Sequence, residues 1–407
     1  MGVVMLILDG LVDVAQWAVK TTTKMVKTAA PYVKKGAEGF FSWISDHISE
    51  NRIELKPINI SLVAPSGFGK TTLISTIMKE IDLTLTRTDK NRTFELNVRP
   101  KNEDDNKRLY ENNKTIVQAI NAGSGRLSTI AIEGTGDISS FQYEIALSAP
   151  DNKKELIQPF CMMDIPGGWI NPKNRIGDDI SSKWSEFEAH LHESRILWIP
   201  IDAVALMEAK TPDEERMRSE LMDIADVATL AIEWAKYRTD DEESCICFVP
   251  VKCETYKLFE NDNLALDFRK KFDAMCKQIV EDVSLAKGNA NIKMYYIPVE
   301  TIGCIKKNNT SWEKQKEKTV FKAEYQITGS HRAIKGADLL LNKVYEYAYN
   351  QIDNMEKYDE NLLKNVNIIE KKKAEMALGL VKKAIKPIKD ELEKYTATAE
   401  KLEEAYM

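Results

Sequence analysis

Residues 58–78 constrain the fold of this chain more than any other stretch. Polar and apolar residues alternate from Asn59 to Val63, and this alternation predicts a β-strand. A short loop with two glycines follows at residues 64–70. Apolar residues then recur at helical spacing, at Leu73, Ile74, Ile77 and Met78. The sequence therefore predicts a strand, a tight loop and a helix in direct succession.

The loop reads Ala-Pro-Ser-Gly-Phe-Gly-Lys-Thr over residues 64–71. It fits the phosphate-binding pattern GxxxxGK[ST], except that Ala64 replaces the first glycine. Alanine is small, so this replacement leaves the loop intact. Gly67 and Gly69 allow the backbone to curl until several N–H groups point to one spot. The N-terminal dipole of the following helix favours an anion at the same spot.

We expect this loop to bind the phosphates of a nucleotide. Lys70 would contact the β- and γ-phosphates, and the Thr71 hydroxyl would bind Mg²⁺. The alternative is a Gly-Lys-Thr turn that arises by chance, but a strand and a helix flank the loop as the motif requires. The residues expected to contact the nucleotide here are Ala64, Ser66, Gly67, Phe68, Gly69, Lys70, Thr71 and Thr72.

A second motif stands at the end of an apolar run over residues 156–163, where Asp164 is followed by Ile-Pro-Gly-Gly. A buried strand that carries an aspartate at its C-terminal end is typical of the Walker B arrangement, whose carboxylate holds Mg²⁺, usually through water. A turn that merely ends a strand is the alternative. The phosphate loop upstream, with another strand between the two motifs, favours the Mg²⁺ site.

Strands and helices alternate over most of the chain. This order predicts an α/β fold, a three-layer sandwich with a mainly parallel sheet covered by helices on both faces. After residue 310 we expect loops and then a helix from residue 336 to about residue 355. The remaining predicted strands cover residues 141–147, 194–202, 245–251 and 292–299, and the main predicted helices cover 103–121, 212–237 and 264–285.

Composition narrows the class of protein. The formal net charge of −6 argues against general affinity for nucleic acid. The six cysteines lie mostly in apolar runs, which favours reduced thiols in a cytoplasmic protein. Cys245 and Cys247 would point to one face of a strand, and we interpret them as buried thiols because no second Cys/His pair completes a metal site. His190 and His192 would lie on different faces of a helix.

The two ends differ from the main domain, which we place at residues 56–345. Residues 1–55 predict an amphipathic helical segment, and residues 346–407 predict a charged helical tail. Basic and aromatic residues share the N-terminal segment, as in helices that lie on an anionic membrane surface. Breaks at Pro31 and Gly36 favour the alternative, packing on the main domain or on a sister subunit. The tail is a candidate for a helical hairpin with the N-terminal segment or for a partner-binding coiled coil.

Three motifs together, at residues 64–71, 164–167 and 252–254, resemble those of the translation-factor-related class of P-loop GTPases. The segments Asp-Ile-Pro-Gly-Gly-Trp and Trp-Ile-Pro-Ile-Asp-Ala make the layout similar to bacterial double-GTPase-type proteins encoded in conflict or defence systems. The resemblance covers about residues 56–345. It implies Mg²⁺-dependent binding and hydrolysis of GTP that switches conformation and partners.

The resemblance also implies roles for single residues. Gly167 would contact the γ-phosphate through its backbone N–H. Thr135, in the loop before the strand at residues 141–147, would bind Mg²⁺ as the first-switch threonine, and Thr129 is the second candidate. The Lys252 stem would stack on the base, and Glu254 would accept hydrogen bonds from guanine. The family has Asn or Thr at position 251 and Asp at position 254, so this chain specifies a triphosphate more firmly than guanine.

The class often places Gln or His directly after the second-switch glycine, where it positions the attacking water. Gly168, Trp169 and Ile170 stand there in this chain. We therefore expect slow intrinsic hydrolysis that self-association or a partner accelerates. A regulatory switch is the preferred interpretation. The alternatives are a membrane-associated, dynamin-like mechanochemical GTPase and a nucleotide-binding scaffold with little hydrolysis.

Overall fold

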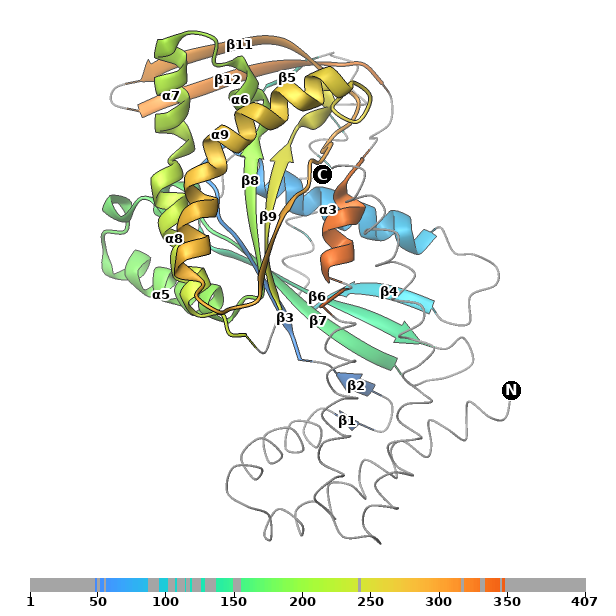
Figure 1. Cartoon of the computed structure of the whole chain (residues 1–407). Helices are drawn as coiled ribbons and strands as arrows, with labels where there is room; N and C mark the ends of the chain where they lie inside the picture. Colours follow the sequence, from blue (N-terminus) through green and yellow to red (C-terminus); the bar gives the residue numbers. More distant parts are fainter. Residues whose placement is uncertain are drawn as a thin grey trace, which may run out of the picture.

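The computed structural model describes residues 48–49, 52–54, 56–86, 95–101, 107, 114, 118, 126–128, 137–148, 155–240, 243–315, 318–329, 334–344 and 346–347. This part of the chain forms an α/β structure with a large sheet and a small one (Figure 1). The predicted fold class is confirmed at this level. The segments expected to be helical before residue 48 and after residue 347 lie outside the described residues.

The centre of the large sheet is parallel. β3 (Ile58–Leu62) lies between β7 (Glu155–Asp164) and β8 (Ile196–Asp202). β9 (Ser244–Val251) and β10 (Ile292–Tyr296) continue the sheet beyond β8, again in parallel. Every residue of β8 and β9 is buried, as expected for strands covered on both faces. The continuous apolar runs in the sequence reflect this double coverage.

The other side of the large sheet is partly antiparallel. β6 (Ser139–Ser148) pairs along the whole of β7, and β4 (Glu95–Pro100) pairs with β6. β2 (Arg52–Glu54) joins the first residues of β7 in parallel, and β1 (Ile48–Ser49) pairs with β2. The sheet therefore begins before residue 56, inside the segment that we expected to be helical.

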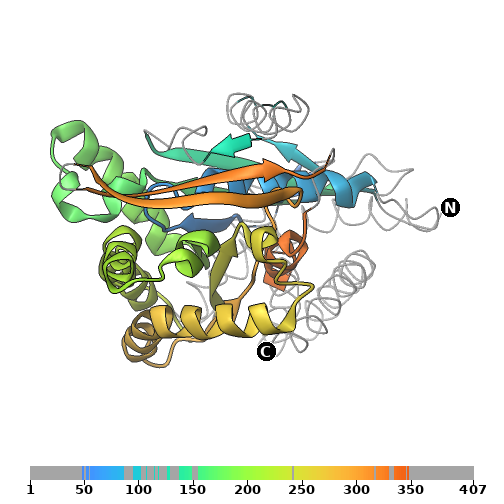
Figure 2. The same ribbon diagram turned by 90° about the horizontal axis from the view of Figure 1, so that it is seen from above.

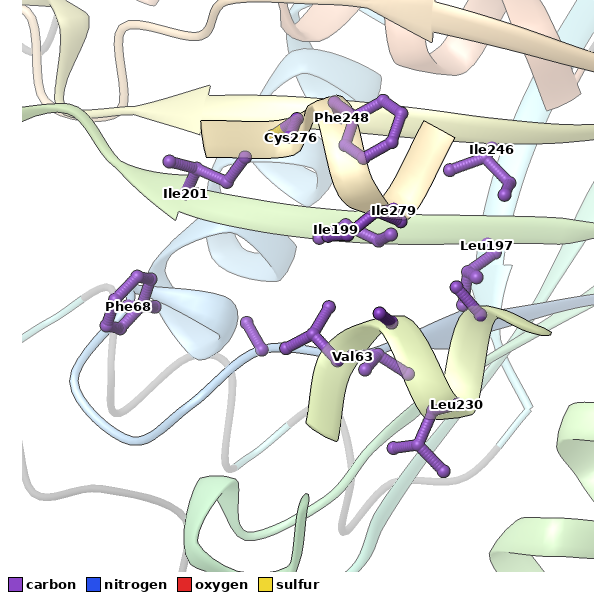
Figure 3. Close-up of a cluster of buried hydrophobic side chains, with 14 of the residues drawn as sticks. Val63, Phe68, Leu197, Ile199, Ile201, Leu230, Ile246, Phe248, Cys276 and Ile279 are labelled. Carbon is purple, nitrogen blue, oxygen red and sulfur yellow. The ribbon is translucent and has the colours of Figure 1, made fainter. Parts of the chain in front are cut away.

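Helices cover both faces of the large sheet. On one face, α3 (Lys70–Thr86) and a helical segment at residues 337–344 pack on the strands in one buried cluster. On the other face lie α5 (Asp178–Glu193), α8 (Ile224–Lys236) and α9 (Asp262–Ala286). Figure 3 shows part of this second cluster, where Ile279 of α9 lies next to Ile199 of β8, and Leu230 of α8 belongs to the same cluster. The predicted three-layer arrangement is present.

The helix predicted over residues 212–237 is divided in two. α7 (Pro212–Met222) ends at Asp223, whose φ of 44° is left-handed, and α8 starts at the next residue. Thr211 begins α7 with a reciprocal capping box to Glu214. The break allows α7 to leave the large sheet and lie beside the small one, while α8 stays in the core (Figure 1).

The small sheet corrects the expectation of loops after residue 310. β11 (Ile305–Gln315) and β12 (Lys318–Ile327) form a long antiparallel hairpin, and β5 (Arg126–Ser128) pairs with β12. The hairpin lies over the carboxyl ends of β8 and β9 (Figures 1 and 2). Most of its residues are partly buried or exposed, so apolar alternation is weak in its sequence. Within the described residues, no helix combines the length and apolarity that crossing a bilayer requires.

Candidate functional site

The predicted site residues gather at the carboxyl edge of the large sheet. After β3 the chain continues through β4 and β6 to β7 on one side of β3, whereas the connection from β7 leads past β3 to β8 on the other side. This divergence makes β3 a topological switch point, which is where open α/β sheets bind ligands. The loop over residues 63–69 follows β3 directly and therefore lies at this position.

The geometry of this loop depends on its two glycines. Gly67 and Gly69 have φ angles of 82° and 76°, which residues with a side chain rarely adopt. Ala64 and Phe68 are buried in the core, whereas Ser66 and Gly67 are exposed. The loop is thus anchored at both ends and presents its middle to solvent. Alanine at position 64 fits because that position is fully enclosed.

Lys70, the first residue of α3, lies inside the loop. Its Nζ donates hydrogen bonds of 2.7 Å and 3.2 Å to the carbonyl oxygens of Ala64 and Pro65. It also lies 4.0 Å from the carboxylate of Asp164, the last residue of β7. Burial lowers the pKa of Lys70, and the negative charge of Asp164 offsets part of this effect. The structure therefore brings together the lysine and the aspartate that the two motifs predicted.

The residues after Asp164 press against the loop. Gly167 begins the short helix η1 (Gly167–Ile170), and a Cβ at this position would overlap the backbone of Pro65 and Ser66. Only glycine fits there, for a steric reason rather than for its φ angle. The Asp-Ile-Pro-Gly segment and the glycine loop are therefore in direct backbone contact.

Two polar side chains fix the η1 turn, and the sequence pattern did not single them out. Asn174 donates a 2.7 Å hydrogen bond to the carbonyl oxygen of Gly168. Arg175 donates hydrogen bonds of 2.7 Å to the carbonyl oxygens of Trp169 and Ile170. The Arg175 guanidinium also stacks 3.4 Å from the ring centroid of Trp184 on α5. The turn and the start of the following helix thus form one unit.

Lys252 and Glu254 lie across the loop from Asp164. Lys252 has a left-handed φ of 64°, and its stem passes beside Gly69. Its ammonium group pairs with Asp202, the last residue of β8, which also accepts N–H bonds of 2.8 Å and 3.0 Å at the start of α6 (Ala203–Glu208). Sequence reasoning missed Asp202, although its place at the end of a buried apolar strand is a usable signal.

Glu254 lies in the turn η3 (Cys253–Tyr256) and is buried. Its carboxylate accepts backbone N–H bonds of 3.2 Å from Thr301 and 2.9 Å from Ile302. Burial raises the pKa of Glu254, and these N–H groups lower it in part. The structure therefore joins Glu254 to the loop after β10.

Three predicted positions are described only in part. Thr72 is buried within α3. Thr71 belongs to α3, but its side chain lies outside the described part. Thr135 and the second candidate, Thr129, also lie outside the described residues. β5 ends one residue before Thr129, and Asp137, two residues after Thr135, pairs at 2.8 Å with Lys183 of α5.

The protein groups at this site could hold Mg²⁺ only if the phosphates of a bound nucleotide supplied further ligands. Among the residues that the structure describes, no group of three or more His, Cys, Asp or Glu side chains could hold a metal ion. Asp164 supplies one buried carboxylate beside the loop, and Thr71 is the predicted second ligand. Mg²⁺ usually takes one or two carboxylates and completes its shell with substrate phosphates and water. The site suits that pattern.

The cysteines and histidines named above contact residues away from this edge. Cys245 and Cys247 are buried thiols with sulfur atoms 3.9 Å apart. His190 contacts the carbonyl oxygen of Ile60, and His192 contacts Glu233. These contacts agree with structural roles for all four residues.

The chain matches no protein-family model, and no curated protein matches it. A buried lysine, a buried aspartate and a glycine loop at a helix N-terminus together can bind a polyphosphate and a divalent cation.

Proposed function

We propose that this chain is a Mg²⁺-dependent P-loop switch that binds and hydrolyses a nucleoside triphosphate, with GTP as the nucleotide that the family resemblance favours. One observation carries the proposal: Lys70 and Asp164 lie 4.0 Å apart where β3 and β7 end, and Gly167 touches the loop between them. This juxtaposition matches the roles of phosphate-binding lysine and Mg²⁺-binding aspartate.

Each residue has a defined task in the proposed reaction. The loop N–H groups and Lys70 hold the phosphates, and Asp164 with Thr71 would hold Mg²⁺, which neutralises phosphate charge when bound. Water then attacks the γ-phosphorus, and the bond to the bridging oxygen breaks to release inorganic phosphate. The turn over residues 168–170 offers no polar side chain to orient that water. Intrinsic hydrolysis is therefore expected to be slow.

Turnover by the purified chain tests this proposal. Phosphate release from GTP with Mg²⁺ should be slow but measurable, and Lys70→Ala should abolish it. Lys277→Ala is the matched control, because Lys277 is an exposed lysine on α9 whose pair, Glu281, lies on the same helix. Equal turnover in the Lys70→Ala variant and the wild type would contradict the proposal.

A nucleotide-binding scaffold is the second candidate. It is favoured by the absence of a polar side chain at residues 168–170 and by the buried, fully engaged Glu254. GTP binding without phosphate release, at any protein concentration, would support the scaffold. The membrane-associated alternative rests on residues 1–55, and co-sedimentation with anionic liposomes, with and without residues 1–50, tests it.

A further inference from the structure

The part of the site that would meet the base is closed by its own hydrogen bonds. Glu254 is 6% exposed, and both carboxylate oxygens are engaged by the loop after β10. One oxygen accepts from the N–H of Thr301 at 3.2 Å. The other accepts from the N–H groups of Ile302 at 2.9 Å and Gly303 at 3.3 Å, and from the Thr301 hydroxyl at 3.4 Å.

Reading guanine through this carboxylate would break that network. Guanine offers N1–H and N2–H to a carboxylate, and its O6 atom has two lone pairs. If Glu254 turned to the base, its four present donors would be released, and O6 could take at most two of them. At least two of the four donors would then lose their acceptor, and leaving enclosed donors unpaired is costly.

Adenine finds no dedicated partner at this place either. An adenine-specific site needs an acceptor for the N6 amino group and a donor for N1. The N–H groups of residues 301–303 already donate to Glu254, and Val251 presents only methyl groups toward Gly69. The N–H groups of this loop and the carboxylate of Glu254 are therefore committed to one another and not to the edge of a base.

Lys252 adds a surface that any base can use. Its ammonium group is held by Asp202, and its Cε would lie 3.9 Å from a Cβ at Gly69. The aliphatic stem is therefore fixed against the phosphate loop. Contact between this stem and the face of a base depends on area and not on the groups at the base edge.

We propose that this site recognises the triphosphate of its ligand and binds GTP and ATP with similar affinity. In this proposal, Glu254 positions the loop at residues 301–303 and does not contact the base. The inference rests on the proposed function and names its substrate class, the purine nucleoside triphosphates. A site that hydrogen-bonds the distinguishing group rejects the analogue by about 10⁴–10⁵-fold, whereas a site without such bonds cannot.

Competition binding tests the inference on the full chain. A fluorescent GTP derivative with Mg²⁺ is displaced by unlabelled GTP and by ATP. The two dissociation constants should agree within about tenfold. A preference of about 100-fold or more for either purine would overturn the inference and leave the proposed function standing. If neither nucleotide binds, the proposed function fails, and the inference fails with it.

The Glu254→Gln variant separates positioning from base reading. As a positioning residue, Glu254 should affect GTP and ATP equally, so that both affinities fall and their ratio stays within about threefold of the wild type. If Glu254 instead read the base, the substitution would lower the affinity for GTP and leave the affinity for ATP unchanged. This outcome would overturn the inference. Should Glu254→Gln fail to fold by circular dichroism, the wild-type ratio and the milder Thr301→Val variant still decide the question.

Discussion

Single residues set how tightly the site loops pack together. Gly167 meets the backbone of Pro65 and Ser66 so closely that no side chain fits between them. Its neighbour Gly168 has ample space, because a Cβ there would lie 4.0 Å from the Asn174 side chain. A side chain is therefore excluded at Gly167 but tolerated at Gly168, and the same substitution at the two positions gives a matched comparison.

We predict that Gly167→Ala separates the Asp-Ile-Pro-Gly segment from the glycine loop. The free energy of unfolding should fall by about 1–3 kcal/mol, as in other overpacked sites, and nucleotide affinity should fall with it. Gly168→Ala is the control and should change the free energy of unfolding and the nucleotide affinity only slightly. Chemical denaturation and calorimetric titration measure the two quantities. Equal effects of the two substitutions would show that the close approach has no role.

Glu300 provides a pH-dependent readout at the same edge of the sheet. Burial raises its pKa to about 7, Lys335 at 3.7 Å opposes the rise, and Glu254 and Glu260 add to it. The folded chain therefore binds more protons than the unfolded chain between the ordinary pKa of 4.5 and about 7. Stability contributed by Glu300 is present at low pH and is lost as the pH rises through this window.

Glu300→Gln should remove this pH dependence. The variant should gain about 1–2 kcal/mol in unfolding free energy relative to the wild type between pH 5 and pH 8. Thermal unfolding across that range measures the difference. A constant difference at all pH values would mean that Glu300 titrates normally.

At the scale of elements, the β11–β12 hairpin links several parts of the site. Glu208 of α6 accepts hydrogen bonds from Lys307 of β11 and, at 2.7 Å, from Tyr256 of η3. Glu220 of α7 accepts a 2.6 Å bond from Thr319 of β12. β5, which precedes the candidate Mg²⁺ ligand Thr135 in sequence, pairs with β12 over residues 324–326. The hairpin therefore joins the segment before Thr135 to the helices at the carboxyl edge.

We predict that release of β5 from β12 alters nucleotide retention. Leu127 pairs in register with Tyr325, and proline there would remove a backbone N–H and disfavour the strand. Leu127→Pro should change the rate of nucleotide release by about fivefold or more, in the range typical of coupled sites. Leu127→Ala keeps the N–H and serves as the control. Identical release from Leu127→Pro and the wild type in stopped-flow experiments would argue against this coupling.

The elements also show what sequence patterns could and could not predict. Strands β7, β8 and β9 were predictable, because burial on both faces leaves largely apolar runs in each, and β3 was predictable from its alternation of polar and apolar residues. The hairpin was not, since only a few of its residues, such as Ala323 and Tyr325, are buried. The division of the 212–237 helix was also missed, because a single left-handed Asp223 leaves no pattern in the sequence.

The candidate site was predictable to a similar extent. Lys70, Asp164 and Gly167 follow from motifs that are local in sequence, and the structure places them together. The partner of Glu254 depends on how the loop after β10 folds back onto η3, about 47 residues away in the chain. Such a contact is tertiary, so the residue type at position 254 alone suggested base reading and could not reveal the network.

At the scale of the whole molecule, one edge of one sheet carries every described site residue. The loops after β3, β7, β9 and β10 converge there, and the small sheet lies over the same edge (Figures 1 and 2). A ligand bound to the glycine loop would therefore lie close to elements from both halves of the chain.

Calorimetric titration of the full chain with a slowly hydrolysed GTP analogue and Mg²⁺ tests the central claim most directly. The account predicts saturable binding of one nucleotide per chain, dependence on Mg²⁺, and loss of binding in Lys70→Ala but not in Lys277→Ala. Absence of binding in the wild type, or equal binding in both lysine variants, would contradict it.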